Sequence, residues 1–121
     1  MTKGKQTDLD ILLRTIRLEN REKLHDMGKR LGYTAAFISA IENGRRQPPD
    51  GFAKLVASHY GLSDEEHARL RRAEDRARET FKIKPESDLA REVTGAFARS
   101  VNAVPESELR QWLHRLELRS D

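Results

Sequence analysis

The chain has 121 residues, of which 36% are charged and 36% hydrophobic, so we expect one small domain, alone or with an appendage, built from surface-rich helices. It contains no cysteine, which excludes disulfides, a cysteine-based zinc site and a thiol nucleophile. Its four histidines are scattered and form no metal-ligand pair at helical spacing, so we expect neither a metal nor a cofactor.

No apolar run approaches the roughly 20 residues that a membrane span needs. The basic start of the chain, MTKGKQTD, lacks the apolar segment of a signal peptide. We therefore expect a soluble, cytoplasmic protein with no membrane association.

Apolar residues recur at helical spacing through the first half of the chain. Thr7 can cap the first helix, Asp50 can cap the fourth after the break at Pro48 and Pro49, and Gly61 can end the fourth. The predicted helices span Asp8–Glu19, Glu22 or Lys23 to Leu31, Ala35–Asn43 and Asp50 to about His59.

The second half of the chain is more highly charged and also mainly helical. Ser63 and Glu66 form a capping box that opens a helix to about Glu79. Its arginines could line a second DNA surface, but the interleaved acids favour a solvated face. Phe81–Lys84 reads as an extended segment or edge strand, and two further helices follow, over Glu86–Val101 and from Pro105 onward.

The stretch from Met27 to Pro48, MGKRLGYTAAFISAIENGRRQP, contains the parts of a helix-turn-helix. Gly28 lies where a side chain would obstruct the crossing helix, Gly32 can adopt the positive φ of a turn, and Thr34 can cap the second helix of the motif. Four apolar residues can hold the two helices together: Met27, Leu31, Ile38 and Ile41. The stretch resembles the Cro/repressor-type (XRE) regulators of bacteria and phages, in a match without gaps.

Together, the predicted elements and the resemblance imply a mainly α fold. We expect a five-helix repressor-like DNA-binding domain, then a short extended segment and two C-terminal helices. We place the helix-turn-helix DNA-binding domain in residues 1–62 and a C-terminal helical dimerisation region in residues 63–121. Eleven lysines and arginines face seven acids in residues 1–60, against twelve and thirteen in residues 61–121. The excess positive charge therefore lies with the motif, as phosphate neutralisation requires.

In these regulators the start of the third helix points into the major groove, and the following loop lies beside it. The residues that the resemblance assigns to DNA binding are Thr34, Ala35, Ala36, Phe37, Ser39, Ala40, Asn43, Arg45, Arg46 and Gln47. The three alanines cannot form bidentate base contacts; they either allow close approach to a thymine methyl or are simply good helix formers. Base-edge hydrogen bonds then fall to Thr34, Ser39, Asn43 or the arginines, and DNA shape can carry a larger share of the readout.

Three further positions near the motif need separate treatment. Leu24 stands where many relatives carry a phosphate-binding glutamine, so Lys23, His25 and the free N–H groups of that helix end are expected to substitute. Glu42 matches a buried glutamate of the family and is expected to bond backbone N–H groups or an arginine such as Arg14 or Arg17. Phe37 lies at the edge of the buried face, where it could belong to the core or contact a thymine.

The C-terminal half carries a surplus of large apolar side chains. We predict a two-fold interface there, although packing within one chain would produce the same pattern. The residues assigned to this dimer interface are Val93, Phe97, Leu109, Trp112, Leu113 and Leu116.

The function expected from the sequence is a sequence-specific regulator of transcription that binds double-stranded DNA, as a homodimeric repressor on a two-fold symmetric operator. The alternative is an antitoxin or antiactivator-type module whose C-terminal half binds a protein partner. No carboxylate cluster, His–Asn pair or metal spacing in the sequence supports an enzyme.

Overall fold

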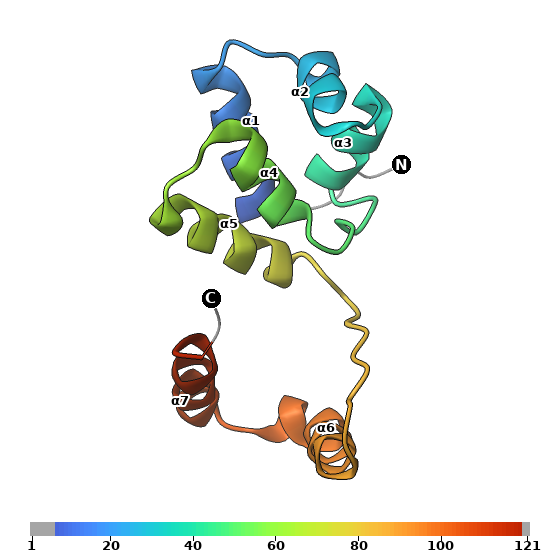
Figure 1. The fold of residues 1–121 in the computed structure, drawn as a ribbon, viewed down its shortest axis with the longest axis vertical. Coiled ribbons are helices and arrows are strands. Elements are labelled where there is room, and N and C mark those ends of the chain that lie inside the picture. Colours follow the sequence, from blue (N-terminus) through green and yellow to red (C-terminus); the bar gives the residue numbers. More distant parts are fainter. Residues whose placement is uncertain (1–6, 120–121) are drawn as a thin grey trace. The chain divides into compact units, whose positions relative to one another are not determined.

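The structure, a computed structural model, describes residues 7–119 (Figure 1). Within these residues it consists of helices and contains no strand, which confirms the mainly α prediction. The chain divides into two compact units, of which the first ends at Phe81 and the second begins at Lys82. Residues 1–6, most of the basic start of the chain, lie outside the described residues.

The first unit contains five helices, close to the predicted ones. Thr7 caps the first helix as predicted, accepting a hydrogen bond from the backbone N–H of Asp10 at 3.3 Å. The capping box of Ser63 and Glu66 is also present, with both reciprocal hydrogen bonds formed. The helices are α1 (Asp8–Glu19), α2 (Leu24–Leu31), α3 (Ala35–Glu42), α4 (Phe52–Tyr60) and α5 (Asp64–Arg76).

A single core joins all five helices. α2 packs against α3, and α5 packs against α4 and α1. The largest fully buried side chains come from every helix of the unit: Phe52, Leu9, Leu13, Met27, Ile38, Leu70 and Val56. Burial of apolar surface on this scale, about 25 cal/mol per Å², is the main stabilising contribution to such a unit.

The N-terminus of α4 differs from the prediction. Asp50 does not cap it: Gly51 is the N-cap residue, with a φ of 77° that favours glycine. The carboxylate of Glu74, on α5, takes the place of a cap by accepting the N–H of Ala53 at 2.8 Å. Glu74 is itself buried and is paired with Arg78 at 2.7 Å. α5 therefore supplies an acceptor that the segment before α4 does not.

The same contacts change the expected domain boundary. We placed it after Leu62, but the compact unit continues through α5 to Phe81. Leu70 and Ala73 of α5 are buried in the core, beside the hydrogen bond from Ala53 to Glu74. The buried face of α5 is narrow, and the rest of the helix is mostly charged and at least partly exposed.

The second unit begins with an irregular segment and contains two α-helices. Ser87 caps the first, and its hydroxyl accepts the N–H of Ala90 at 3.0 Å. The helices are α6 (Asp88–Ser100), the short 3₁₀ helix η1 (Val101–Ala103) and α7 (Glu106–Glu117). No residue in these three helices is buried, so this unit has no closed core in a single chain.

We predict that a chain ending at Phe81 folds on its own, whereas one ending at Leu62 does not fold stably. The shorter chain loses the buried Leu70 side chain, and losing a leucine of this kind to alanine already costs about 2–5 kcal/mol. It also leaves the N–H of Ala53 without its acceptor. Urea unfolding followed by circular dichroism should show a cooperative transition for the longer chain only. Equal midpoints for the two chains would show that α5 is dispensable.

Candidate nucleic-acid interface

A tight turn connects α2 to α3 (Figure 1). Gly32 ends α2 with a φ of 85°, and the N–H of Tyr33 donates to the carbonyl of Gly28 at 2.7 Å. Thr34 caps α3 as predicted, its hydroxyl accepting the N–H of Phe37 at 3.0 Å. These bonds fix the direction in which α3 leaves the turn.

Gly28 lies directly against this turn. A Cβ placed on it would lie 2.7 Å from the carbonyl oxygen of Tyr33 and 3.0 Å from the carbonyl carbon of Thr34. Both are backbone atoms, which cannot move away without disturbing the turn. Glycine at this position therefore permits the close crossing, as the sequence predicted.

Phe37 joins the start of α3 to the loop that follows it. Its ring stacks on Tyr33, with centroids 4.4 Å apart, and the guanidinium of Arg46 lies 4.7 Å from its centroid on a cation–π contact. The ring is half-buried, so it both borders the core and supports a basic side chain. Tyr33 was not among the predicted site residues, because an aromatic residue in the turn itself belongs to neither helical pattern.

The loop after α3 presents two exposed arginines. Asn43 holds Arg45, since its side-chain oxygen accepts both the backbone N–H of Arg45 at 3.2 Å and the side-chain Nε at 3.1 Å. Arg46 is held over Phe37. Both side chains are thus oriented before any ligand arrives, which lowers the entropy lost on binding.

Gln47 follows these arginines and has a different set of contacts. Its side-chain oxygen accepts the N–H of Glu79 at 3.0 Å, and its side-chain nitrogen donates to the carbonyl of Thr80 at 3.3 Å. Both ends of the amide are therefore engaged within the protein.

The two faces of α3 differ as a DNA-reading helix requires. Ile38 and Ile41 are buried against the core. The predicted reading positions lie on the opposite side and are exposed or partly exposed: Thr34, Ala35, Ala36, Ser39, Ala40 and Asn43. The structure thus brings these positions together with Arg45 and Arg46 on one continuous surface.

The start of α2 borders the same motif. Lys23 and His25 are exposed there, and Leu24 between them packs partly against the core. The packing of Leu24 against the core accounts for an apolar residue where the resemblance led us to expect a glutamine. One N–H of this helix end is already used, because the backbone of Lys23 donates to the Asp26 carboxylate at 2.8 Å.

Glu42 at the end of α3 is buried and faces away from this surface. Arg17 on α1 binds it through two parallel hydrogen bonds, of 2.8 and 3.1 Å, so of the two arginines considered, Arg17 is its partner. Burial raises the pKa of the Glu42 carboxyl above its usual range, and the bond from Arg17 opposes that shift. A carboxylate at the end of α3 is thereby neutralised rather than presented to a phosphate.

Comparison with known proteins agrees with this geometry. A family model described as a helix-turn-helix domain matches residues 9–70, from the start of α1 into α5. The chain belongs to the helix-turn-helix domain family. No curated protein and no solved structure matches the chain.

Membership of the helix-turn-helix family supports a DNA-binding regulator, and such proteins are typically not enzymes. Between residues 7 and 119 no group of three or more histidines, cysteines or acids is arranged to hold a metal ion. No helix in that part of the chain is long and apolar enough to cross a membrane.

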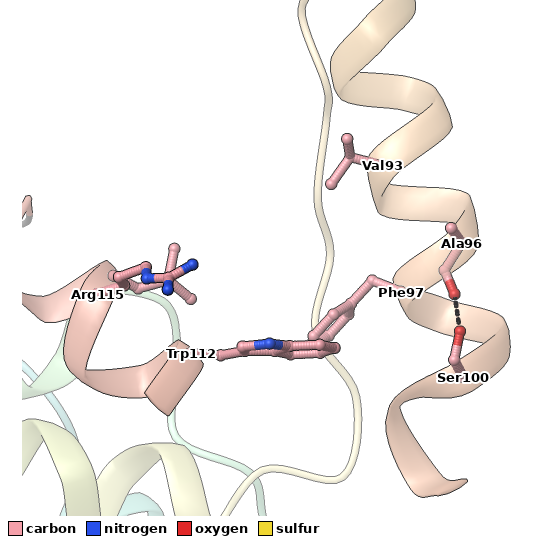
Figure 2. Close-up of a pocket in the computed structure, with 7 residues that line it drawn as sticks. Val93, Ala96, Phe97, Ser100, Trp112 and Arg115 are labelled. Carbon is pink, nitrogen blue, oxygen red and sulfur yellow. Dashed lines mark hydrogen bonds between the residues drawn. The ribbon is translucent and has the colours of Figure 1, made fainter. Parts of the chain in front are cut away.

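The second unit of this helix-turn-helix protein holds the six residues assigned to dimerisation. Val93 and Phe97 on α6 and Trp112 on α7 lie around an open apolar groove (Figure 2). The volume of this groove is about 440 Å³. The rings of Phe97 and Trp112 lie 5.9 Å apart. Leu116 also lines the groove, with Ala96, Ser100 and Arg115, whereas Leu109 and Leu113 do not.

Proposed function

We propose that the protein is a Cro/repressor-type (XRE) regulator of transcription that binds specific sites in double-stranded DNA as a homodimer. The observation that carries this proposal is that the exposed start of α3 and the loop with Arg45 and Arg46 are joined. Phe37 stacks beneath Arg46, so the exposed start of α3 and the basic loop form one face. A helix of this kind enters the major groove while the adjacent basic groups bind the backbone.

Within this face we assign phosphate binding to Arg45, Arg46, Lys23 and His25. Base-edge hydrogen bonds are assigned to Thr34, Ser39 and Asn43. The amide nitrogen of Asn43 is the part of that side chain available for a base, because its oxygen holds Arg45. This division gives the protein its affinity mainly through the loop and its specificity mainly through α3.

The alanines of α3 favour a close approach of the helix to the bases. Ala35, Ala36 and Ala40 present only methyl groups, which can contact thymine but donate no hydrogen bond. We therefore propose that DNA shape contributes more to readout here than in relatives with polar residues at these positions.

We further propose that α6 and α7 form the dimer interface. Val93 is 61% exposed, Phe97 41% and Leu116 62% in the single chain, a large apolar area for a unit with so many charges. Pairing with a second copy would bury it and place two reading helices on two half-sites, about one DNA turn apart. A dimer bound at a promoter in the cytoplasm would repress by occlusion.

The alternative function rests on the same groove. An antitoxin or antiactivator-type protein would cover α6 and α7 with a partner protein rather than a second copy. The oligomeric state of the full chain distinguishes the two proposals.

Replacing both Arg45 and Arg46 by alanine should strongly reduce DNA binding. Loss of two phosphate contacts should also lower the slope of log K against log salt by roughly two units per protomer. The measurement is fluorescence anisotropy with a duplex selected from random sequences by the wild-type protein. The matched control is Arg91→Ala with Arg110→Ala, which removes the same charge from exposed positions of α6 and α7. Equal affinity and slope in the Arg45/Arg46 variant and the wild type would show that the DNA surface lies elsewhere.

Trp112→Ala should lower self-association, because the indole lines the groove and contacts Phe97. Operator affinity should fall with it, since a monomer loses the second half-site. Sedimentation at micromolar concentration measures the first effect, with Gln111→Ala, on an exposed neighbouring position, as the control. A wild-type monomer that binds a two-fold symmetric site tightly would contradict the homodimer and favour the partner-binding alternative.

A further inference from the structure

The segment after α5 is attached to the loop that follows α3. Gln47 accepts the N–H of Glu79 and donates to the carbonyl of Thr80, at 3.0 and 3.3 Å. The Gln47 side-chain amide thus bonds one N–H and one carbonyl of the segment, as the backbone of a neighbouring β-strand would. The start of the segment is thus held by Gln47, the residue that follows Arg46 in the chain.

Arg78 provides a second attachment to the same loop. Its guanidinium donates to the carbonyl of Pro49 at 2.9 Å and pairs with Glu74 at 2.7 Å, and its side chain is only 8% exposed. Two separate side chains therefore join residues 78–80 to residues 47–49. The segment therefore leaves the first unit at a defined point, beside Gln47, which directly follows Arg45 and Arg46 in the chain.

The residues that follow are basic and apolar in alternation. Thr80–Pro85 reads TFKIKP and contains two lysines and no acid. Lys82 and Lys84 are exposed and form no hydrogen bond or ion pair with any residue between 7 and 119. Pro85 favours an extended backbone at Lys84, and in an extended chain alternate side chains point to the same side.

Chain connectivity limits how far these lysines can lie from Thr80, the residue that Gln47 holds. A residue advances at most about 3.6 Å in an extended chain, so the Cα of Lys82 lies within about 7 Å of that of Thr80, and the Cα of Lys84 within about 14 Å. This limit holds wherever the second unit is placed. Both lysines therefore stay within about 14 Å of Thr80, which is bonded to Gln47.

We propose that Lys82 and Lys84 form a basic arm that binds the DNA backbone beside the helix-turn-helix, and that Gln47 positions this arm instead of reading bases. The proposal rests on the proposed function, because it takes the DNA-facing surface to include the loop with Arg45 and Arg46. Lysine is a flexible point charge suited to phosphate contacts without base discrimination. The arm therefore adds affinity and salt dependence but little specificity.

The first test replaces both lysines by glutamine in the full chain. The Lys82→Gln, Lys84→Gln variant should bind a mixed-sequence duplex more weakly, with a salt slope lower by about two units per protomer. The Lys82→Arg, Lys84→Arg variant should retain the wild-type slope. Arg91→Gln with Arg110→Gln, which removes the same charge from α6 and α7, should have a much smaller effect. Equal slopes in the lysine variant and the wild type, or equal losses in the lysine variant and this control, would overturn the arm.

The second test is a double-mutant cycle with Gln47→Ala. If Gln47 acts through the arm, its replacement lowers affinity in the wild-type background and has little further effect in the Lys82→Gln, Lys84→Gln background. Equal losses in both backgrounds would show that Gln47 contacts DNA directly and would overturn its positioning role.

The outcome for the wild-type protein separates this proposal from the proposed function. A wild-type protein that binds the duplex while the lysine variant binds equally well overturns the arm alone. A wild-type protein that binds no duplex overturns the DNA-binding function, and the arm with it.

Discussion

The close crossing of α2 and the turn before α3 is the constraint on which the proposed DNA surface depends. Gly28 packs so closely against the backbone of Tyr33 and Thr34 that there is no room for a Cβ at this position. The hydroxyl of Thr34 caps the first turn of α3. Once α3 has this direction, Ile38 and Ile41 must face the core. The alanines, Ser39 and Asn43 are then left on the outer side, and the loop brings Arg46 back over Phe37. A glycine and a cap thus determine which side chains are available to DNA.

Acid–base pairing inside the unit gives this surface its charge. Glu42 is neutralised by Arg17, and Glu74 is held by Arg78 while it accepts the N–H of Ala53. Removing one residue of such a buried pair lowers the free energy of unfolding by about 3–5 kcal/mol, because the remaining charge is left buried without a partner. The acids that pack around α3 and α4 are thus withdrawn from the surface, and the arginines of the loop stay free of acidic partners among the described residues. Positive potential at a DNA-facing surface steers association and strengthens it at low salt.

Most of the helices could be predicted because their caps and periodicity are local properties of the sequence. Thr7, Thr34 and the box of Ser63 and Glu66 all cap the helices they were expected to cap. The acceptor at the start of α4 could not be predicted, since Glu74 lies 21 residues from Ala53 in the chain. The end of the compact first unit at Phe81 depends on the same contacts between residues far apart in the chain. At the candidate site the reading positions follow from the motif, whereas the hydrogen bonds of Gln47 to Glu79 and Thr80 form only when the loop after α3 meets the segment after α5.

The most direct test of the central claim is to locate α3 on DNA. Because the chain has no cysteine, Ala36→Cys provides a single thiol at an exposed position near the start of α3, to which a DNA-cleaving chelate can be attached. The control is Glu65→Cys on α5, which packs against α1 and α4. If α3 lies in the major groove, the chelate at position 36 should cleave a bound duplex at a few discrete bases around that groove. The chelate at position 65 on α5 should cleave the duplex little. Discrete cleavage from α5 and none from α3 would contradict it.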